Sequence, residues 1–305
     1  MSNLELQSRQ HSQQGFFDKN FSWLFPAPSV IIMLILMAFP VAYTLYLSFT
    51  KWSPTSLGTP EFIGFENYIN LIIDDERFLK ALWRTIWFTV AAVGIQTVLG
   101  VGLALIFNRE FVGRGIVRTV FLMSMVATPV AIALVWMMIM DINTGILNYF
   151  LDLVVGIRVG WLNDRSIVLW SMIIIDTWQW TPFIMLITLA GLSALPTEPY
   201  ESAVIDGASS VQLFWYLTLP MLRPTLMVAL MFRSIDALKT FDIIYVITQG
   251  GPAYASETLN LYGFSQGFLY FNMGYGSALL ILYFMLVMGT SLAFIRLRRT
   301  VSEAM

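Results

Sequence analysis

The sequence contains no cysteine and only one histidine among its 305 residues. The absence of cysteine excludes disulfide bonds, iron–sulfur clusters and thiolate chemistry. The single histidine, His11, lies in a polar, Gln-rich stretch, which argues against a histidine-based metal centre or catalytic triad. The four lysines follow Asp, Thr, Leu and Leu, so the Gly-Lys pair of a P-loop is also absent. The sequence therefore predicts no metal site and no Walker A nucleotide site on this chain.

Charge is also scarce, at 12% of residues, whereas apolar residues make up 57% and the mean hydropathy is +0.72. These values lie outside the range of a soluble domain. They predict one all-α membrane domain over residues 23–296, with six spans long enough to cross about 30 Å of hydrocarbon. The predicted spans are 23–49, 82–107, 116–140, 167–191, 224–247 and 273–295.

Lysine and arginine near the span ends predict the orientation, because cytoplasmic loops carry more of both. An even number of spans places both termini on the same side. That side would carry Arg9, Lys19, Arg109, Arg114, Arg118, Arg223, Arg296, Arg298 and Arg299. The opposite side would carry Lys51, Arg77, Lys80, Arg84, Arg158 and Arg165. The bias predicts that the tails 1–22 and 297–305 are cytoplasmic. The first tail has no cleavable signal pattern.

A long polar interruption, residues 195–222, separates the fourth and fifth predicted spans. Pro199 suits the first turn of a helix, and Glu201 lies near that start, where negative charge is favoured. Gly207 suits a left-handed C-cap, and Ser209 or Ser210 can cap a second helix over 211–217. Pro220 is expected to end that second helix. So short a helix needs a surface on which to dock, and another protein can supply it.

The spacing within this loop resembles the EAA motif of permease subunits of binding-protein-dependent ABC importers. The matching positions are Glu201, Ser202, Ala203, Gly207, Leu217, Leu219 and Pro220. Ser202 and Leu217 depart conservatively from Ala and Ile. Segments 195–208, 241–245 and 248–252 resemble the carbohydrate branch of the family. Segment 62–68 also resembles the first permease subunit of the maltose and glycerol-phosphate type.

The resemblance implies a coupling loop whose core is Glu201, Ala203 and Gly207. It implies a second, similar permease subunit and two copies of an ATPase that binds ATP and Mg, with no cofactor on this chain. A periplasmic or lipid-anchored solute-binding protein would deliver the solute, and the chain would reside in the bacterial inner membrane. The expected solute is a sugar, polyol or sugar derivative, and the sequence does not specify which one.

Charges within predicted spans are costly, and they mark either a solute pathway or fixed helix packing. The fifth span holds Arg233, Asp236 and Lys239 at i, i+3 spacing, with Asp242 beyond them. We keep open whether they face the pore or pair internally. On the fourth span, Asp176, Gln179 and Trp180 share a face with Phe183. They suit either recognition of sugar hydroxyls or a tryptophan belt with a polar packing pair.

Two other functions remain as alternatives. An ion-coupled secondary transporter of a small polar solute would use Asp176 and the fifth-span charges as its relay. It would leave the polar loop 195–222 unexplained. A membrane-embedded lipid enzyme would need a ligand cluster or a nucleophile–base pair, which the sequence lacks. No basic, aromatic-laced segment indicates nucleic acid. Outside the spans, 65–84 predicts an interfacial helix. The composition of 250–272 suits part of the outer mouth, a contact with the binding protein, or an ordinary interfacial loop.

Overall fold

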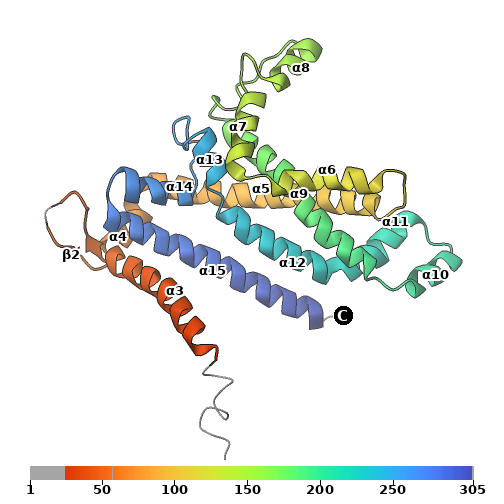
Figure 1. Cartoon of the computed structure of the whole chain (residues 1–305), viewed down its shortest axis with the longest axis horizontal. Coiled ribbons are helices and arrows are strands. Elements are labelled where there is room, and N and C mark those ends of the chain that lie inside the picture. Colours follow the sequence, from red (N-terminus) through yellow and green to blue (C-terminus); the bar gives the residue numbers. More distant parts are fainter. Residues whose placement is uncertain (1–24, 57, 304–305) are drawn as a thin grey trace, which may run out of the picture.

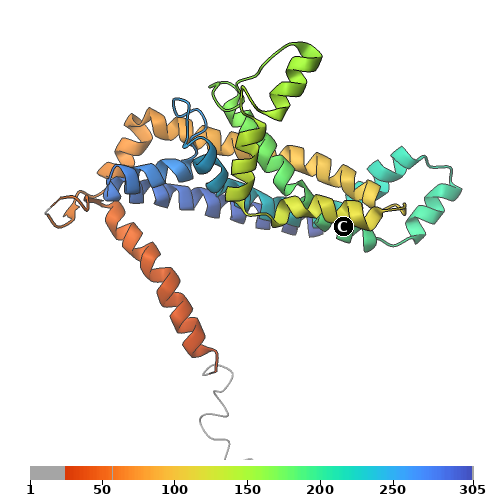
Figure 2. The ribbon, with the colours of Figure 1, turned by 45° about the horizontal axis from the view of Figure 1, so that its top comes forward.

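The structure is a computed structural model, and it describes residues 25–303 except residue 57. Five described helices are long and apolar enough to cross a membrane, or six if a bent pair counts as one span. Figures 1 and 2 show an elongated bundle of these helices with short helices at both ends. The predicted N-terminal tail lies outside the described residues.

The centre of the bundle is the pair α5 (Glu76–Phe107) and α9 (Val168–Ser193). They approach closely, because a Cβ at Gly100 would lie 2.7 Å from Cβ of Ile184. Only glycine permits this separation. Helix α12 (Leu219–Leu238) packs against both of them, and α9 is the most enclosed span, with 67% of its apolar window buried.

The outer members of the bundle are α3 (Ala27–Ser48) and α15 (Met273–Glu303). Helix α3 contacts α15 near one end and then diverges from the other helices (Figure 1). Only 6% of its apolar window is buried within the chain. Helix α15 continues through the residues predicted to form the C-terminal tail as far as Glu303.

The third predicted span, 116–140, is not one straight helix. It consists of α6 (Arg114–Val126) and α7 (Pro129–Ile139), which are bent by 102°. Ala127 and Thr128 are extended between them. The cause is Pro129, because proline disfavours helical backbone in the residue before it and donates no backbone hydrogen bond.

The fifth predicted span, 224–247, also differs from the prediction. A continuous helical stretch starts with α11 (Ser210–Leu213) and the π-helical turn η2 (Phe214–Thr218) and runs into α12. It breaks after Leu238, and α13 (Asp242–Ile247) is a separate short helix. The expectation that Pro220 ends a helix is wrong. Pro220 lies in the first turn of α12, where its missing N–H is tolerated.

One end of the bundle carries a small hairpin and several short helices. Strands β1 (Thr50–Lys51) and β2 (Glu61–Phe62) pair antiparallel. They are followed by α4 (Glu66–Ile69) and the π-helical turn η1 (Asn70–Asp74). Helix α5 begins directly afterwards at Glu76, so the predicted interfacial helix 65–84 is replaced by these short turns and the first residues of α5.

The remaining short helices lie at both ends and along one side. Helices α13, α14 (Leu259–Phe264) and η3 (Ser265–Leu269) precede α15, and α8 (Ile146–Val155) follows α7. Helix α10 (Glu198–Ile205) lies with α11 at the end of the bundle opposite to β2 and α4 (Figure 1).

Candidate functional site

A buried ion network joins the three central helices. The Arg233 guanidinium on α12 donates to the Asp176 carboxylate on α9 through Nη2. Its Nε donates to Oε1 of Gln96 on α5 at 2.8 Å, and its Nη1 donates to Oδ2 of Asp236 at 2.9 Å. Gln96 closes the network by donating from Nε2 to Oδ2 of Asp176 at 2.8 Å. One guanidinium therefore ties α5, α9 and α12 together.

The network is enclosed at one side and open at the other. The side chains of Arg233 and Asp176 are each 1% exposed, whereas that of Asp236 is 48% exposed. Trp180 is half-buried, and the guanidinium lies 5.2 Å from the centre of its ring. A buried ion pair is stable only when its geometry and further hydrogen bonds offset desolvation. Gln96 and Trp180 supply those additional contacts here.

Two buried acceptors beside this network have no partner among the described residues. They are Oδ1 of Asp176 and Oε1 of Gln179. A buried acceptor without a hydrogen bond is costly, so such groups mark places where a donor from outside the chain can bind. Hydroxyl groups of a solute are donors of this kind. The face of α9 that carries these oxygens also carries Trp180 and Phe183, whose rings meet edge to face.

Four of the six predicted pathway residues lie together in this network: Asp176, Trp180, Arg233 and Asp236. Gln179 is adjacent on α9, but its side chain makes no hydrogen bond there. Lys239 caps the end of α12, is exposed and forms no ion pair within the described chain. Sequence reasoning missed Gln96. The available signal was a lone amide side chain in the middle of the apolar stretch 82–107.

The polar loop at the opposite end of the bundle is built from two capped helices. Pro199 lies in the first turn of α10, together with Glu198 and Glu201. Helix α10 ends at Ile205, and Gly207, two residues later, has the left-handed φ of +84° expected from the sequence. The Ala208 N–H donates to the Ala203 carbonyl at 2.9 Å, which satisfies the helix end.

The second helix starts at Ser209, which forms a capping box with Gln212. This confirms one of the two caps that the sequence allowed. Tyr200 Oη donates to Oγ1 of Thr218 at 3.0 Å and ties α10 back to η2. Leu219 packs beside a buried cluster of Val101, Leu222 and Leu226 within the bundle. The loop is thus attached to the bundle through its second helix.

The outer part of this loop is apolar and uncovered. No residue of α10 is buried, and Glu201 and Ser202 are exposed. A cavity of about 350 Å³ lies between the two helices, with Ala203, Gly207 and Leu217 in its wall. Around it, large exposed apolar side chains are Val204, Ile205, Val211, Trp215 and Tyr216. Such a patch on a polar loop is typical of a docking surface.

A second polar cluster, missed from the sequence, lies at the hairpin end. Arg77 at the start of α5 forms a bidentate pair with Glu257, at 2.8 Å from Nε and 2.7 Å from Nη2. The Arg77 guanidinium lies 3.7 Å from the centre of the Tyr254 ring. The two partners are 180 residues apart in the chain, so neither helical periodicity nor motif spacing could join them.

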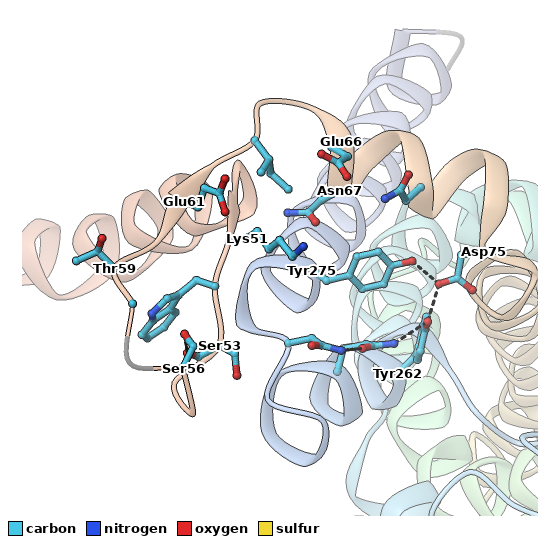
Figure 3. A pocket seen from close by; sticks show the side chains of 16 residues that line it. Lys51, Ser53, Ser56, Thr59, Glu61, Glu66, Asn67, Asp75, Tyr262 and Tyr275 are labelled. Carbon is cyan, nitrogen blue, oxygen red and sulfur yellow. Dashed lines mark hydrogen bonds between the residues drawn. The ribbon is translucent and has the colours of Figure 1, made fainter.

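Beside this pair, Asp75 caps α5 by accepting the Phe78 N–H at 2.9 Å. Its other oxygen accepts hydroxyl hydrogen bonds from Tyr262 and Tyr275, each at 2.6 Å (Figure 3). Burial by itself would raise the pKa of Asp75, but these hydrogen bonds outweigh it and lower the pKa below its usual value. Asp75 is therefore a carboxylate at neutral pH.

Comparison with known proteins gives consistent results. Residues 96–300 match the family model described as binding-protein-dependent transport system inner membrane component. The trehalose/maltose transport system permease protein MalF of Thermococcus litoralis is 34% identical over 291 residues, covering 94% of this chain and 97% of MalF. The sulfoquinovosyl glycerol transport system permease protein SmoG of Agrobacterium fabrum is 35% identical, covering 93% and 92%.

The solved structures agree on the fold. A chain of a bacterial alginate ABC transporter, in complex with an alginate pentasaccharide-bound periplasmic protein, superposes with a TM-score of 0.81 at 21% identity, covering 93% of this chain and 96% of that one. Within the described residues, no group of three or more His, Cys, Asp or Glu side chains is arranged to hold a metal ion. The chain belongs to the family of binding-protein-dependent transport system inner membrane components, which are multi-pass transport permeases and not enzymes.

Proposed function

We propose that this chain is one permease subunit of an ATP-driven importer for a sugar, polyol or sugar derivative. The observation that carries the proposal is the capped helix–Gly–helix loop with its uncovered apolar face, on a chain that itself lacks the Gly-Lys of a P-loop. Relatives named as trehalose/maltose and sulfoquinovosyl glycerol permeases support the carbohydrate class. They favour this function over an ion-coupled secondary transporter.

The proposed assembly has the partners expected from the sequence. A second permease subunit would complete the pathway, and two ATPase copies would bind ATP and Mg and receive the coupling loop. A periplasmic or lipid-anchored binding protein would deliver the solute. The chain would cross the membrane six times, with the bent pair α6–α7 as one crossing. Both termini and the loop 195–222 would then be cytoplasmic. The two clustered arginines in the last described turns of α15, Arg296 and Arg298, support this orientation.

The proposed solute path passes the open side of the ion network. Asp236 and Trp180 are the accessible members, and Arg233 holds Asp176 and Gln96 in place behind them. Lys239, exposed one helical turn beyond Asp236, would lie on the same path. The unpartnered oxygens of Asp176 and Gln179 would accept hydrogen bonds from solute hydroxyls. Aromatic faces such as that of Trp180 suit the apolar faces of sugar rings.

The coupling role is tested by solute-stimulated ATP hydrolysis of the assembled complex. Glu201→Ala is expected to reduce the stimulation several-fold, whereas Glu198→Ala, in the same exposed helical turn, leaves it near wild type. Gly207→Ala is expected to impair coupling as well, because a left-handed backbone costs a non-glycine residue about 1–2 kcal/mol. No atom blocks a Cβ at this position, so the effect would come from the backbone alone. Full stimulation in both Glu201→Ala and Gly207→Ala would refute the coupling role.

A further inference from the structure

The hairpin end of the bundle contains a cavity of about 820 Å³ (Figure 3). Its walls come from the β1–β2 hairpin, from α4 and η1, and from the start of α15. Lys51 and Glu61, which lie opposite each other on the two strands, form one side. Asn67 and Glu66 form another, and Asp75 with its two tyrosines forms the back (Figure 3).

Three apolar helices end beside this cavity. Helix α3 ends at Ser48, α5 begins at Glu76 and α15 begins at Met273. Each is long and apolar enough to cross the hydrocarbon core, so their common end lies at the depth of the lipid head groups. Trp52, Tyr262 and Tyr275 in the cavity wall are side chains typical of that depth.

The cavity is lined by charged side chains of both signs, and most of them have no partner within the described chain. Lys51, Glu61 and Glu66 are exposed, and none of them makes an ion pair or side-chain hydrogen bond within the described chain. With Asp75, the sum is one positive and three negative charges, or −2. Asn67 is 6% exposed, and its Nδ2 donates to the carbonyls of Ser48 and Thr50. Its Oδ1 has no donor in the described chain and remains available as an acceptor.

An apolar surface for acyl chains adjoins the cavity. Helix α3 leads directly into Lys51, and large apolar side chains along its length are exposed within the chain, among them Leu45, Tyr46 and Val41. A ligand with a charged head at Lys51 and hydrocarbon along α3 would satisfy both features. A free sugar could hydrogen-bond to the polar groups of the cavity, but it has no hydrocarbon to cover the adjoining apolar surface of α3.

We propose that this cavity binds the head group of a phospholipid that carries both a phosphate and a primary ammonium, as phosphatidylethanolamine does. The phosphate binds Lys51. The ammonium donates to the carboxylates of Glu61 and Glu66 and to Oδ1 of Asn67. An anionic head group without an ammonium is disfavoured by the net charge of −2. A quaternary ammonium binds more weakly, because it has no N–H to donate.

The test uses the assembled complex in nanodiscs of phosphatidylcholine that contain equal minor fractions of phosphatidylethanolamine and phosphatidylglycerol. Native mass spectrometry then counts the lipids retained after detergent release. Retention is expected to favour phosphatidylethanolamine. Lys51→Gln should lower it about tenfold, the effect of losing one charge-assisted hydrogen bond, and the double variant Glu61→Gln/Glu66→Gln should lower it about a hundredfold, because it loses two such bonds. Glu110→Gln, an exposed carboxylate in the loop between α5 and α6, is the matched control.

Glu61→Gln alone changes an exposed hairpin residue outside the helical core. It should lower retention of phosphatidylethanolamine while the thermal unfolding temperature of the complex stays at the wild-type value, which separates loss of lipid from loss of fold. Equal retention in the cavity variants and in Glu110→Gln would overturn the proposal. So would retention of the three lipids by the wild-type complex in proportion to their abundance in the nanodisc. Saturable binding of maltose that the cavity variants abolish, with lipid retention unchanged, would assign the cavity to a carbohydrate instead and would also overturn it.

Discussion

Arg233 is one of the most enclosed charged residues described in this chain, and its two carboxylate partners differ sharply in exposure. Asp176 is buried with it, whereas Asp236 reaches the surface. Coulomb attraction is strong and poorly screened for the first pair and weak for the second. The same guanidinium therefore performs two tasks. It holds three helices together through Asp176 and Gln96. It also places a positive charge beside the half-exposed carboxylate of Asp236.

This difference in exposure predicts that breaking the two ion pairs lowers the stability of the chain by unequal amounts. Arg233→Met leaves the Asp176 carboxylate buried without a cation and is expected to destabilise the chain by about 3–5 kcal/mol. Asp236→Asn, at a half-exposed site, is expected to lower stability by only about 0–1 kcal/mol. Thermal unfolding in detergent measures both effects. Arg233→Met/Asp176→Asn should recover part of the loss, because no buried charge then remains unpaired. Equal destabilisation by Arg233→Met and Asp236→Asn would contradict the asymmetry.

At the scale of elements, the sequence predicted features that depend on neighbouring residues better than contacts between segments far apart in the chain. Hydropathy located the apolar spans, and local rules located the Gly207 cap and the Ser209 cap. Those features depend on neighbours within a few residues. The bidentate contact of Arg77 with Glu257 depends on how distant segments meet in space. The contact of Gln96 with Arg233 does too, across 137 residues. The only sequence sign of Gln96 was a polar side chain in an apolar stretch.

The sequence contains a local signal for the bend between α6 and α7, namely Pro129. The prediction of one span over 116–140 followed the hydropathy of the segment and not this signal. Residues 116–140 are apolar throughout, yet Thr128 is extended because Pro129 follows it. Spin labels at the exposed residues Ile116 and Met138 would be about 33 Å apart on a straight helix, at 1.5 Å per residue. With the 102° bend they are expected about 20 Å apart.

Double electron–electron resonance on the labelled chain measures this distance. Pro129→Ala should add a longer-distance population, because alanine restores a backbone donor and removes the restriction on Thr128. The packing of α7 on α13 opposes straightening, so the shorter distance should persist in part. A single wild-type distance near 33 Å would show that the third span is straight.

At the scale of the whole molecule, the two ends of the bundle differ in what they present. One end carries the polar hairpin, the Arg77–Glu257 pair and the cavity of about 820 Å³. The other carries α10 and α11 with an uncovered apolar patch. The buried network of Arg233 lies between them on the three central helices α5, α9 and α12. A change at the α10–α11 end can reach this network through α12, because α11, η2 and α12 form one continuous helical stretch.

The continuous helical stretch from α11 to α12 leads to a prediction about the energy source of solute uptake. If force from a partner ATPase enters through α11 and moves α12, uptake should depend on ATP hydrolysis and not on an ion gradient. In proteoliposomes that contain the whole complex, an uncoupler and a sodium ionophore should leave solute uptake near its control rate. Replacing the P-loop lysine of the partner ATPase should abolish it. An ion-coupled transporter would give the reverse, because its charged groups within the membrane, here Asp176 and Asp236, would relay the driving ion. Uptake that persists with the disabled ATPase and collapses with the ionophore would therefore assign the Arg233 network to ion coupling.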